Sequence, residues 1–143
     1  VCVVDAASLP ASSTAAAAVT AADALVLMTS TFGSGDPPQA AMEFVRWLER
    51  GAVHGGVKDI PFAVFGLGNS CYTKFCGAAV SMDKLAEAAG GIRLLEAYKA
   101  DEMGGEALTF KTWIRDLASS MRAAGLLSSR QATSIAGTVG KEE

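Results

Sequence analysis

The sequence predicts an α/β fold, a doubly wound parallel sheet with helices on both faces. Four short runs are apolar without polar alternation, as expected of strands buried on both sides, and they span residues 1–4, 24–28, 62–65 and 92–95. Longer amphipathic segments lie between them, and this alternation is typical of parallel strands joined by helices. Half of the 143 residues are hydrophobic, so the chain can bury one core without disulfides or a metal.

Three segments carry apolar residues at helical spacing, over residues 39–50, 74–89 and 106–124. In the first, Phe44 and Leu48 are four residues apart, and Gly51 stands where a left-handed cap would end a helix. Gly90 and Gly125 stand at the corresponding places after the other two. Each segment is therefore expected to be a helix that covers the sheet.

The chain is expected to divide into one domain and a short tail. Residues 1–126 carry the strand and helix patterns and form the predicted domain. Residues 127–143 have few large apolar side chains and no clear period, so burial there cannot offset the entropy lost on ordering. We predict that this last segment is a linker or a disordered tail.

Composition and charge argue against several classes of function. The net charge of −3 and a sequence pI near 5.1 give no support to nucleic-acid binding, which usually shows as a basic face. The three cysteines, Cys2, Cys71 and Cys76, form no C-x-x-C pair, and His54 is the one histidine. Neither a metal site nor a Ser/His/Asp triad is indicated, and we expect no catalytic side chain.

The cellular setting is expected to be the cytoplasm. The odd number of cysteines is typical of reduced thiols in a cytosolic compartment. The longest apolar stretch, residues 15–28, is too short and too interrupted to span a bilayer, so no membrane segment is expected in this chain. A longer parent protein could still carry an anchor.

Two glycine-rich segments follow predicted strands, residues 29–38 and residues 66–75. Ligands in open α/β sheets bind beyond the carboxyl ends of the strands, where these segments fall. Each combines hydroxyl or amide groups, glycines that let backbone approach a ligand, and an aromatic side chain, Phe32 or Tyr72. This mixture suits a flat ring such as an isoalloxazine, which needs aromatic faces and polar groups along one edge.

Three motifs, TSTFGSGDPP, FAVFGLGNSCYTKFC and ADEMGGEALTFKTW, occur in this order over residues 29–38, 62–76 and 100–113. In this order and spacing they resemble the FMN-binding, flavodoxin-like domains of NADPH-dependent diflavin reductases. That group includes cytochrome P-450 reductase, the reductase half of nitric oxide synthase, and the flavoprotein of sulfite reductase. The resemblance implies a flavodoxin-like fold and an FMN site.

The resemblance also assigns residues to the site. Phe32 and Tyr72 are implied to cover the two faces of the flavin. The residues implied to line its two sides are Ser30, Thr31, Gly33, Ser34 and Gly35 on one, and Leu67, Gly68, Asn69, Phe75 and Cys76 on the other. The Gly33 carbonyl is implied to accept a hydrogen bond from the reduced flavin. Asp101 and Glu102 match the acidic loop of the family, and we expect them to dock the electron acceptor.

The implied function is electron transfer. Electrons are expected to pass from NADPH to FAD in a separate C-terminal module, then to FMN in this domain, and then singly to a haem protein. The flavin supplies the redox chemistry, while the protein positions it and tunes its potential.

The sequence departs from the family pattern at two places. Cys76 stands where cytochrome P-450 reductases usually have Asn, and there it resembles the nitric oxide synthases. The family also begins with a central strand and a Ser/Thr/Gly loop for the FMN phosphate, and nothing in this sequence matches them; residues 1–4 align with the second strand. We therefore expect this chain by itself to bind FMN weakly.

Two other functions fit parts of the pattern. A free-standing flavodoxin-like NAD(P)H quinone reductase would need its own nicotinamide and substrate pocket over the flavin. A flavin-free interaction module would keep the two loops without the phosphate site. The yellow colour of a flavin in a purified preparation separates the last alternative from the others.

Overall fold

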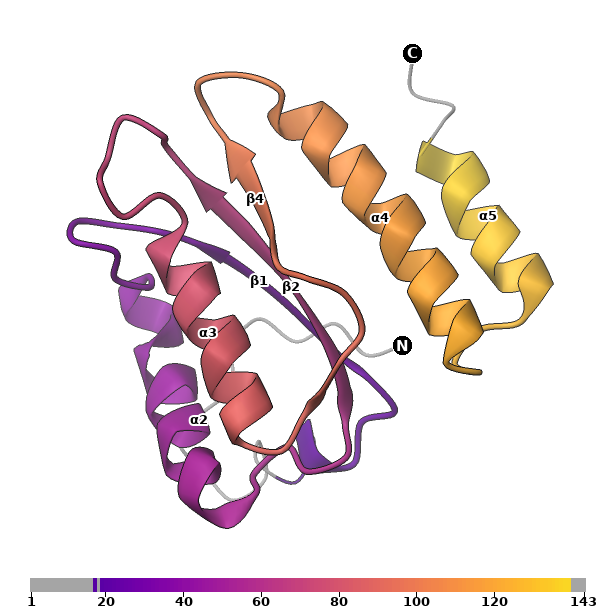
Figure 1. Cartoon of the computed structure of the whole chain (residues 1–143), viewed down its shortest axis with the longest axis horizontal. Coiled ribbons are helices and arrows are strands. Elements are labelled where there is room, and N and C mark those ends of the chain that lie inside the picture. The colour runs from indigo at the N-terminus through magenta and orange to yellow at the C-terminus, as the bar shows by residue number, and fades with distance from the viewer. Residues whose placement is uncertain (1–16, 18, 140–143) are drawn as a thin grey trace.

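The computed structural model describes residues 17 and 19–139 (Figure 1). Along the chain the elements are β1 (Leu25–Ser30), the 3₁₀ helix η2 (Gln39–Ala41), α2 (Met42–His54), β2 (Pro61–Gly68), α3 (Gly77–Ala88), β3 (Ile92–Arg93), β4 (Tyr98–Asp101), α4 (Glu106–Ala123) and α5 (Ser129–Val139). The predicted strand at residues 1–4 lies outside the described residues.

The strands form one parallel sheet, and this confirms the predicted fold class. β2 lies between β1 on one side and both β3 and β4 on the other. Leu25 pairs with Phe62 at one end of the β1–β2 ladder and Ser30 with Leu67 at the other. β3 pairs with the beginning of β2, and β4 pairs with its end, where Gly68 stands opposite Asp101. Three loops, after β1, β2 and β4, therefore emerge at the same end of the sheet (Figure 1).

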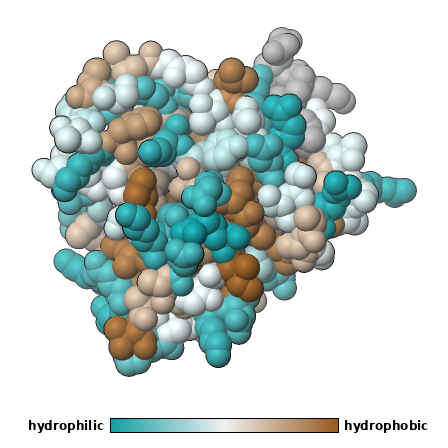
Figure 2. All heavy atoms as spheres, in the orientation of Figure 1, coloured by the Kyte–Doolittle hydropathy of each residue, from teal (hydrophilic) through white to brown (hydrophobic). Residues whose placement is uncertain are grey.

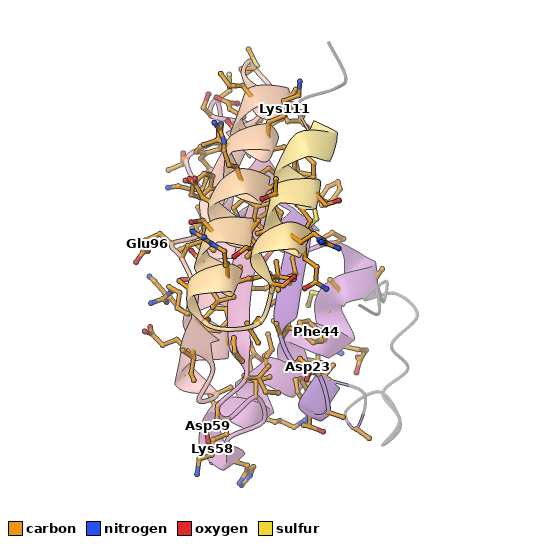
Figure 3. The ribbon with its side chains drawn as sticks, turned by 90° about the vertical axis from the view of Figure 1, so that its right-hand side faces the viewer. Asp23, Phe44, Lys58, Asp59, Glu96 and Lys111 are labelled. Atoms are coloured by element: carbon orange, nitrogen blue, oxygen red, sulfur yellow. The ribbon has the colours of Figure 1, made fainter. Side chains whose placement is uncertain are left out.

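Helices cover one face of the sheet and, on the other face, the part formed by β2 and β4, where Val26 and Met28 of the neighbouring β1 are 43% and 54% exposed. Phe62 and Val64 of β2 face one way, into a cluster that includes Phe44 and Leu48 of α2 and Ala79 of α3. Because side chains alternate along a strand, Ala63 and Phe65 face the other way and pack against Trp113 and Leu117 of α4. The view turned by 90° shows α4 and α5 in front of the strands (Figure 3).

Each helical layer contains one tryptophan. Trp113 is 1% exposed, and its ring centroid lies 4.9 Å from that of Phe65. Its indole N–H has no hydrogen-bond partner among the described residues. Trp47 on α2 is half-buried and stacks on Phe44 with a centroid distance of 5.8 Å. Both tryptophans are thus packing residues of their layers.

The first helix ends later than the sequence predicts. Gly51 is buried inside α2 and does not cap it. Its backbone packs against Gly56, since a Cβ on Gly51 would lie 3.1 Å from the Gly56 Cα. The left-handed cap is Gly55, with φ 72°, and the N–H groups of Gly55 and Gly56 both donate to the Gly51 carbonyl. The predicted end of this helix at residue 50 was therefore wrong.

The fourth predicted strand is shorter than expected, and a further strand follows it. Residues 92–95 were expected to form the fourth strand, but β3 ends at Arg93; the Leu94 N–H still donates to the Phe62 carbonyl, and the side chains of Leu94 and Leu95 pack against the α4 cluster. The chain pairs with β2 again as β4, over Tyr98–Asp101. The second predicted helix likewise begins at Gly77 instead of residue 74, because Cys76 takes a left-handed φ of 52° just before it.

The segment predicted to be a linker or a disordered tail contains a helix. α5 spans Ser129–Val139 and packs alongside α4. Most of its described side chains are exposed, and Ile135 is 37% exposed. A helix of this kind can also serve as a linker, so the domain boundary at residue 126 stays a prediction.

The end of the sheet where the strands begin, which we call the closed end, is tightly packed. Val57 is fully buried, and its N–H donates to the Ala89 carbonyl while that of Asp59 donates to Gly90. Beside them the Arg93 guanidinium binds the Asp83 carboxylate through both oxygens, at 3.1 and 2.8 Å, and also binds Glu87. Lys58 and Asp59 mark this end in Figure 3.

Candidate functional site

The opposite end of the sheet, the open end, is formed by the three loops after β1, β2 and β4. Here three large apolar side chains are mostly in solvent: Phe32 is 59% exposed, Tyr72 65% and Met103 62%. Exposed apolar side chains also occur elsewhere, such as Val53 of α2 at 77%, and Figure 2 shows hydrophobic residues scattered among hydrophilic ones. Phe32 and Tyr72 are, however, the aromatic side chains that are more than half exposed among the described residues, so these rings are candidates for ligand contact.

The first loop is a tight turn closed by backbone hydrogen bonds. The Phe32 N–H donates to the Asp36 carbonyl at 2.8 Å, and the Asp36 N–H donates back to Phe32 at the same distance. Gly33 and Gly35 take positive φ angles of 49° and 102° inside this turn. The Lys74 side chain lies against it, since a Cβ on Gly35 would be 2.8 Å from the Lys74 Cδ. The turn thus holds Phe32 at the surface on a fixed backbone.

The second loop folds over its own asparagine. The Asn69 side-chain oxygen accepts the Cys71 N–H at 2.8 Å, and the Asn69 carbonyl accepts the Tyr72 N–H at 3.1 Å. Asn favours such turns because its side chain can replace a backbone acceptor. The turn places Tyr72 three residues further on, in solvent.

Beneath this loop the start of α3 lies against the end of β2. A Cβ on Gly68 would lie 2.9 Å from both the backbone nitrogen and the sulfur of Cys76, so glycine is required for this close approach. Cys76 is fully buried, and burial raises the pKa of its thiol, so the sulfur stays protonated and is not a nucleophile. The Thr31 hydroxyl accepts the Ala78 N–H at 3.3 Å, which joins the first loop to α3.

The third loop is joined to the second through carboxylates. One oxygen of Asp101 accepts the N–H groups of Ser70 and Met103, each at 3.1 Å. The pKa of Asp101 lies below its usual range. The largest cause is hydrogen bonding by the Ser70 side chain, and the backbone N–H groups of Met103 and Ser70 add to it. The Glu102 carboxylate accepts a hydrogen bond from the Asn69 side-chain amide, and the Glu102 N–H donates to the Gly68 carbonyl.

Comparison with known proteins identifies the family. The profile of the flavodoxin family matches residues 2–113. The chain belongs to the flavodoxin family. The crystal structure of oxidised Flavodoxin 1 from Bacillus cereus superposes with a TM-score of 0.60, covering 79% of this chain and 71% of that one, at 22% identity. At that level of identity the likeness concerns the fold.

The relatives of this flavodoxin-family chain are longer proteins, most of them named reductases. NADPH–cytochrome P450 reductase of Musca domestica is 36% identical over 88 residues, and inducible nitric oxide synthase of Gallus gallus is 35% identical over 89 residues. These matches cover 62% of this chain but 13% and 8% of the relatives. The sulfite reductase [NADPH] flavoprotein alpha-component of Neisseria meningitidis serogroup C is 43% identical over 77 residues, or 54% of this chain and 13% of that protein. The resemblance expected from the three motifs is therefore confirmed.

The flavodoxin-family sheet brings the residues predicted for the site to one end. Those exposed there are Phe32, Gly33, Ser34 and Tyr72, while Ser30, Thr31, Gly35, Leu67, Gly68, Asn69 and Phe75 are half-buried. Leu67 packs against the α4 cluster, and Phe75 packs against the cluster of α2 and α3 with the Lys99 ammonium 5.8 Å from its ring centre. Cys76 has no exposed surface in this structure, so its side chain lies under the loops.

The sequence did not reveal how these loops are joined. The bonds from Ser70 and Asn69 to the third loop link residues more than 30 positions apart. A short-range pattern cannot show such a contact. The one available indication was that Asp101 and Glu102 follow a run that ends near the ligand end of the sheet.

No metal site or membrane span was found in the described ranges. Within residues 17 and 19–139, no group of three or more His, Cys, Asp or Glu side chains could hold a metal ion. In the same part of the chain no helix combines the length and the apolar character needed to cross a membrane.

Proposed function

We propose that this chain is the FMN-binding domain of an NADPH-dependent diflavin oxidoreductase and that it passes single electrons from FAD, through FMN, to a haem-protein acceptor. The observation that carries the proposal is the pair of exposed aromatic rings, Phe32 and Tyr72, on two glycine-rich loops at one end of a flavodoxin-family sheet. Exposing two large aromatic side chains is unfavourable in water, and a flat amphipathic ligand would remove that cost.

The chemistry of the two loops fits an isoalloxazine ring. Phe32 and Tyr72 offer its faces, and the backbone at Gly33, Gly68 and Asn69 offers polar groups for its edge. Bound FMN would supply one-electron redox chemistry, which no side chain of this chain provides. The chain's own residues would hold the ring, orient it and exclude water from it.

The names of the relatives support the rest of the electron path. Two of them are NADPH reductases, and one of these is named a flavoprotein. We propose that FAD and NADPH bind in a separate module of such a protein and that this domain meets both that module and the acceptor in the cytoplasm. Asp101 and Glu102 make the rim acidic and would attract a basic acceptor surface.

Titration of flavin into the purified chain tests the proposal. We expect the protein to quench the fluorescence of FMN and that of riboflavin saturably, since the ring contacts would come from the two loops. Riboflavin separates these contacts from phosphate binding. Failure of both to bind at concentrations up to about 1 mM, a free energy of roughly −4 kcal/mol, would overturn the proposal and favour a flavin-free interaction module.

Bound flavin would still leave a free-standing quinone reductase as an alternative. Such an enzyme would accept hydride from NAD(P)H directly. Mixing the flavin-loaded chain with NADPH under anaerobic conditions therefore separates the two: rapid bleaching of the flavin would favour the quinone reductase, while none is expected for a domain that receives electrons from FAD.

A further inference from the structure

The carboxylates of Asp101 and Glu102 meet the turn that carries Tyr72, and this inference rests on the function proposed above. Asp101 is the last residue of β4 and Glu102 follows it, and both side chains reach across to the loop after β2. Asp101 accepts the Ser70 N–H, and Glu102 accepts the side-chain amide of Asn69. The two donor residues, Asn69 and Ser70, stand immediately before Cys71 and Tyr72 in the same turn.

The contacts continue from there to the aromatic ring. Asn69 receives the Cys71 N–H on its side chain and the Tyr72 N–H on its carbonyl. Its side-chain amide group can therefore donate to Glu102 while its oxygen holds the turn, which fixes the Asn69 rotamer from both sides. The backbone bond from Glu102 to the Gly68 carbonyl adds a third link between the same two loops.

Tyr72 has little else to hold it. Residues 70 to 74 are all exposed, and the Tyr72 ring itself is 65% exposed, so apolar packing contributes little to its position. An exposed loop that is not packed is held mainly by its hydrogen bonds. Bonds to charged acceptors are the strongest of these, and Asp101 accepts two N–H groups on one oxygen.

We propose that Asp101 and Glu102 are positioning residues of the flavin site: their carboxylates hold the 69–72 turn so that the Tyr72 ring is already in place when the flavin arrives. Preorganisation of this kind raises affinity because less freedom is lost on binding. The two residues would thus act on the ring-binding loop from a neighbouring strand, in addition to contributing charge to the rim.

Alanine and amide substitutions separate positioning from charge. Asp101→Ala and Glu102→Ala remove the acceptors, whereas Asp101→Asn and Glu102→Gln remove the charge and keep a side-chain oxygen that can accept the same N–H. Glu106→Ala is the matched control, since Glu106 is an exposed acid in the first turn of α4. All five variants would be compared with wild type in flavin titrations at moderate salt.

We expect Asp101→Ala to weaken FMN binding about tenfold and Glu102→Ala by about threefold, with the amide variants and Glu106→Ala within about twofold of wild type. The fluorescence of fully bound flavin should rise in the alanine variants, because a stacked tyrosine quenches it. Amide exchange of Ser70 and Tyr72, measured without flavin, should accelerate in Asp101→Ala and return toward wild type in Asp101→Asn.

Three results would overturn the inference. The first is wild-type FMN affinity and wild-type amide exchange in both alanine variants. The second is an amide variant as weak as its alanine counterpart, which would assign the effect to charge alone. If Asp101→Ala does not fold, the test rests on Glu102→Ala. The third result is then wild-type FMN affinity and wild-type amide exchange in Glu102→Ala. Failure of wild type to bind any flavin would instead remove the proposed function, while the exchange data would still report on the turn.

Discussion

At the closed end of the sheet, buried side chains, close backbone contacts and an ion pair leave little room for change, whereas at the open end the loops meet through hydrogen bonds and leave aromatic rings in solvent. Val57 and Ala89 are fully buried at the first, while Phe32 and Tyr72 are more than half exposed at the second. Arg93 binds the buried Asp83 carboxylate at the closed end, whereas Asp101 accepts backbone N–H groups at the surface of the open end. The difference teaches that stability and ligand contact are assigned to opposite ends of the same strands.

The largest effect is expected from Arg93→Ala. The substitution leaves the Asp83 carboxylate, 7% exposed, without its cation, and we expect a loss of about 3 kcal/mol in the free energy of unfolding. Flavin affinity of the folded variant should not change. Urea denaturation measures the loss, and Glu87→Ala is the control, since its side chain is 57% exposed and should cost less than about 1 kcal/mol. Equal losses in the two variants would mean that burial of Asp83 does not decide the effect.

Tyr72→Ala should show the opposite pattern. Because the ring is 65% exposed, we expect the free energy of unfolding to change by less than about 0.5 kcal/mol. FMN affinity should fall about tenfold, through lost stacking on the flavin. Phe32→Ala should behave similarly, and Tyr72→Asp should be weaker still because it sets a negative charge against the anionic reduced flavin. Unchanged FMN content in both Tyr72 variants would place the ring elsewhere.

Tyr98→Phe tests the region between the two ends. The Tyr98 hydroxyl donates to the Asp116 carboxylate on α4, and this bond raises the pKa of the phenol. A raised pKa in the folded state means that the bond contributes fully below the ordinary tyrosine pKa of about 10 and is lost as the pH rises through the folded value. We expect the variant to be about 1 kcal/mol less stable at pH 8.

The pH series provides the check on Tyr98. The difference in unfolding free energy between wild type and Tyr98→Phe should shrink as the pH is raised above about 10. A constant difference from pH 7 to pH 11 would show that packing of the ring, rather than the bond to Asp116, sets the cost.

The smallest effect is expected from Glu102→Gln. The amide keeps an oxygen for Asn69 and removes one negative charge from the rim, so FMN content should stay at the wild-type value. Transfer to a basic haem protein should slow by about twofold to threefold at low ionic strength and recover at high salt, because salt shortens the range of charge steering. Stopped-flow reduction of the acceptor measures it, and equal rates at low salt would remove Glu102 from the docking surface.

Much of the fold could be predicted because buried parallel strands and amphipathic helices leave a strong local pattern. The run at residues 62–65 and the stripe of Phe110, Ile114 and Leu117 are examples, and both lie where expected. β4 had no such pattern. Its strand is set by pairing with the end of β2, a contact that the segment Tyr98–Asp101 does not announce by itself.

The remaining differences have similar causes. Gly51 resembles a helix cap in the sequence, but packing against Gly56 keeps it inside the helix. At the site, the aromatic and glycine residues of the two loops were apparent from their positions after strands. The bonds from Asn69 and Ser70 to the third loop depend on how β2 and β4 align, so they emerge only once the sheet is assembled.

The placement of one tryptophan in each helical layer gives the protein two internal reporters. Indole emission moves to longer wavelength as water reaches the ring. Trp113, 1% exposed beside Phe65, should therefore emit at a shorter wavelength than the half-buried Trp47. The variants Trp47→Phe and Trp113→Phe would each retain one of these two emission bands. Following the emission wavelength of each variant through a denaturant series would show whether the layer of α4 separates from the sheet before the layer of α2 and α3, or whether both unfold in one cooperative step.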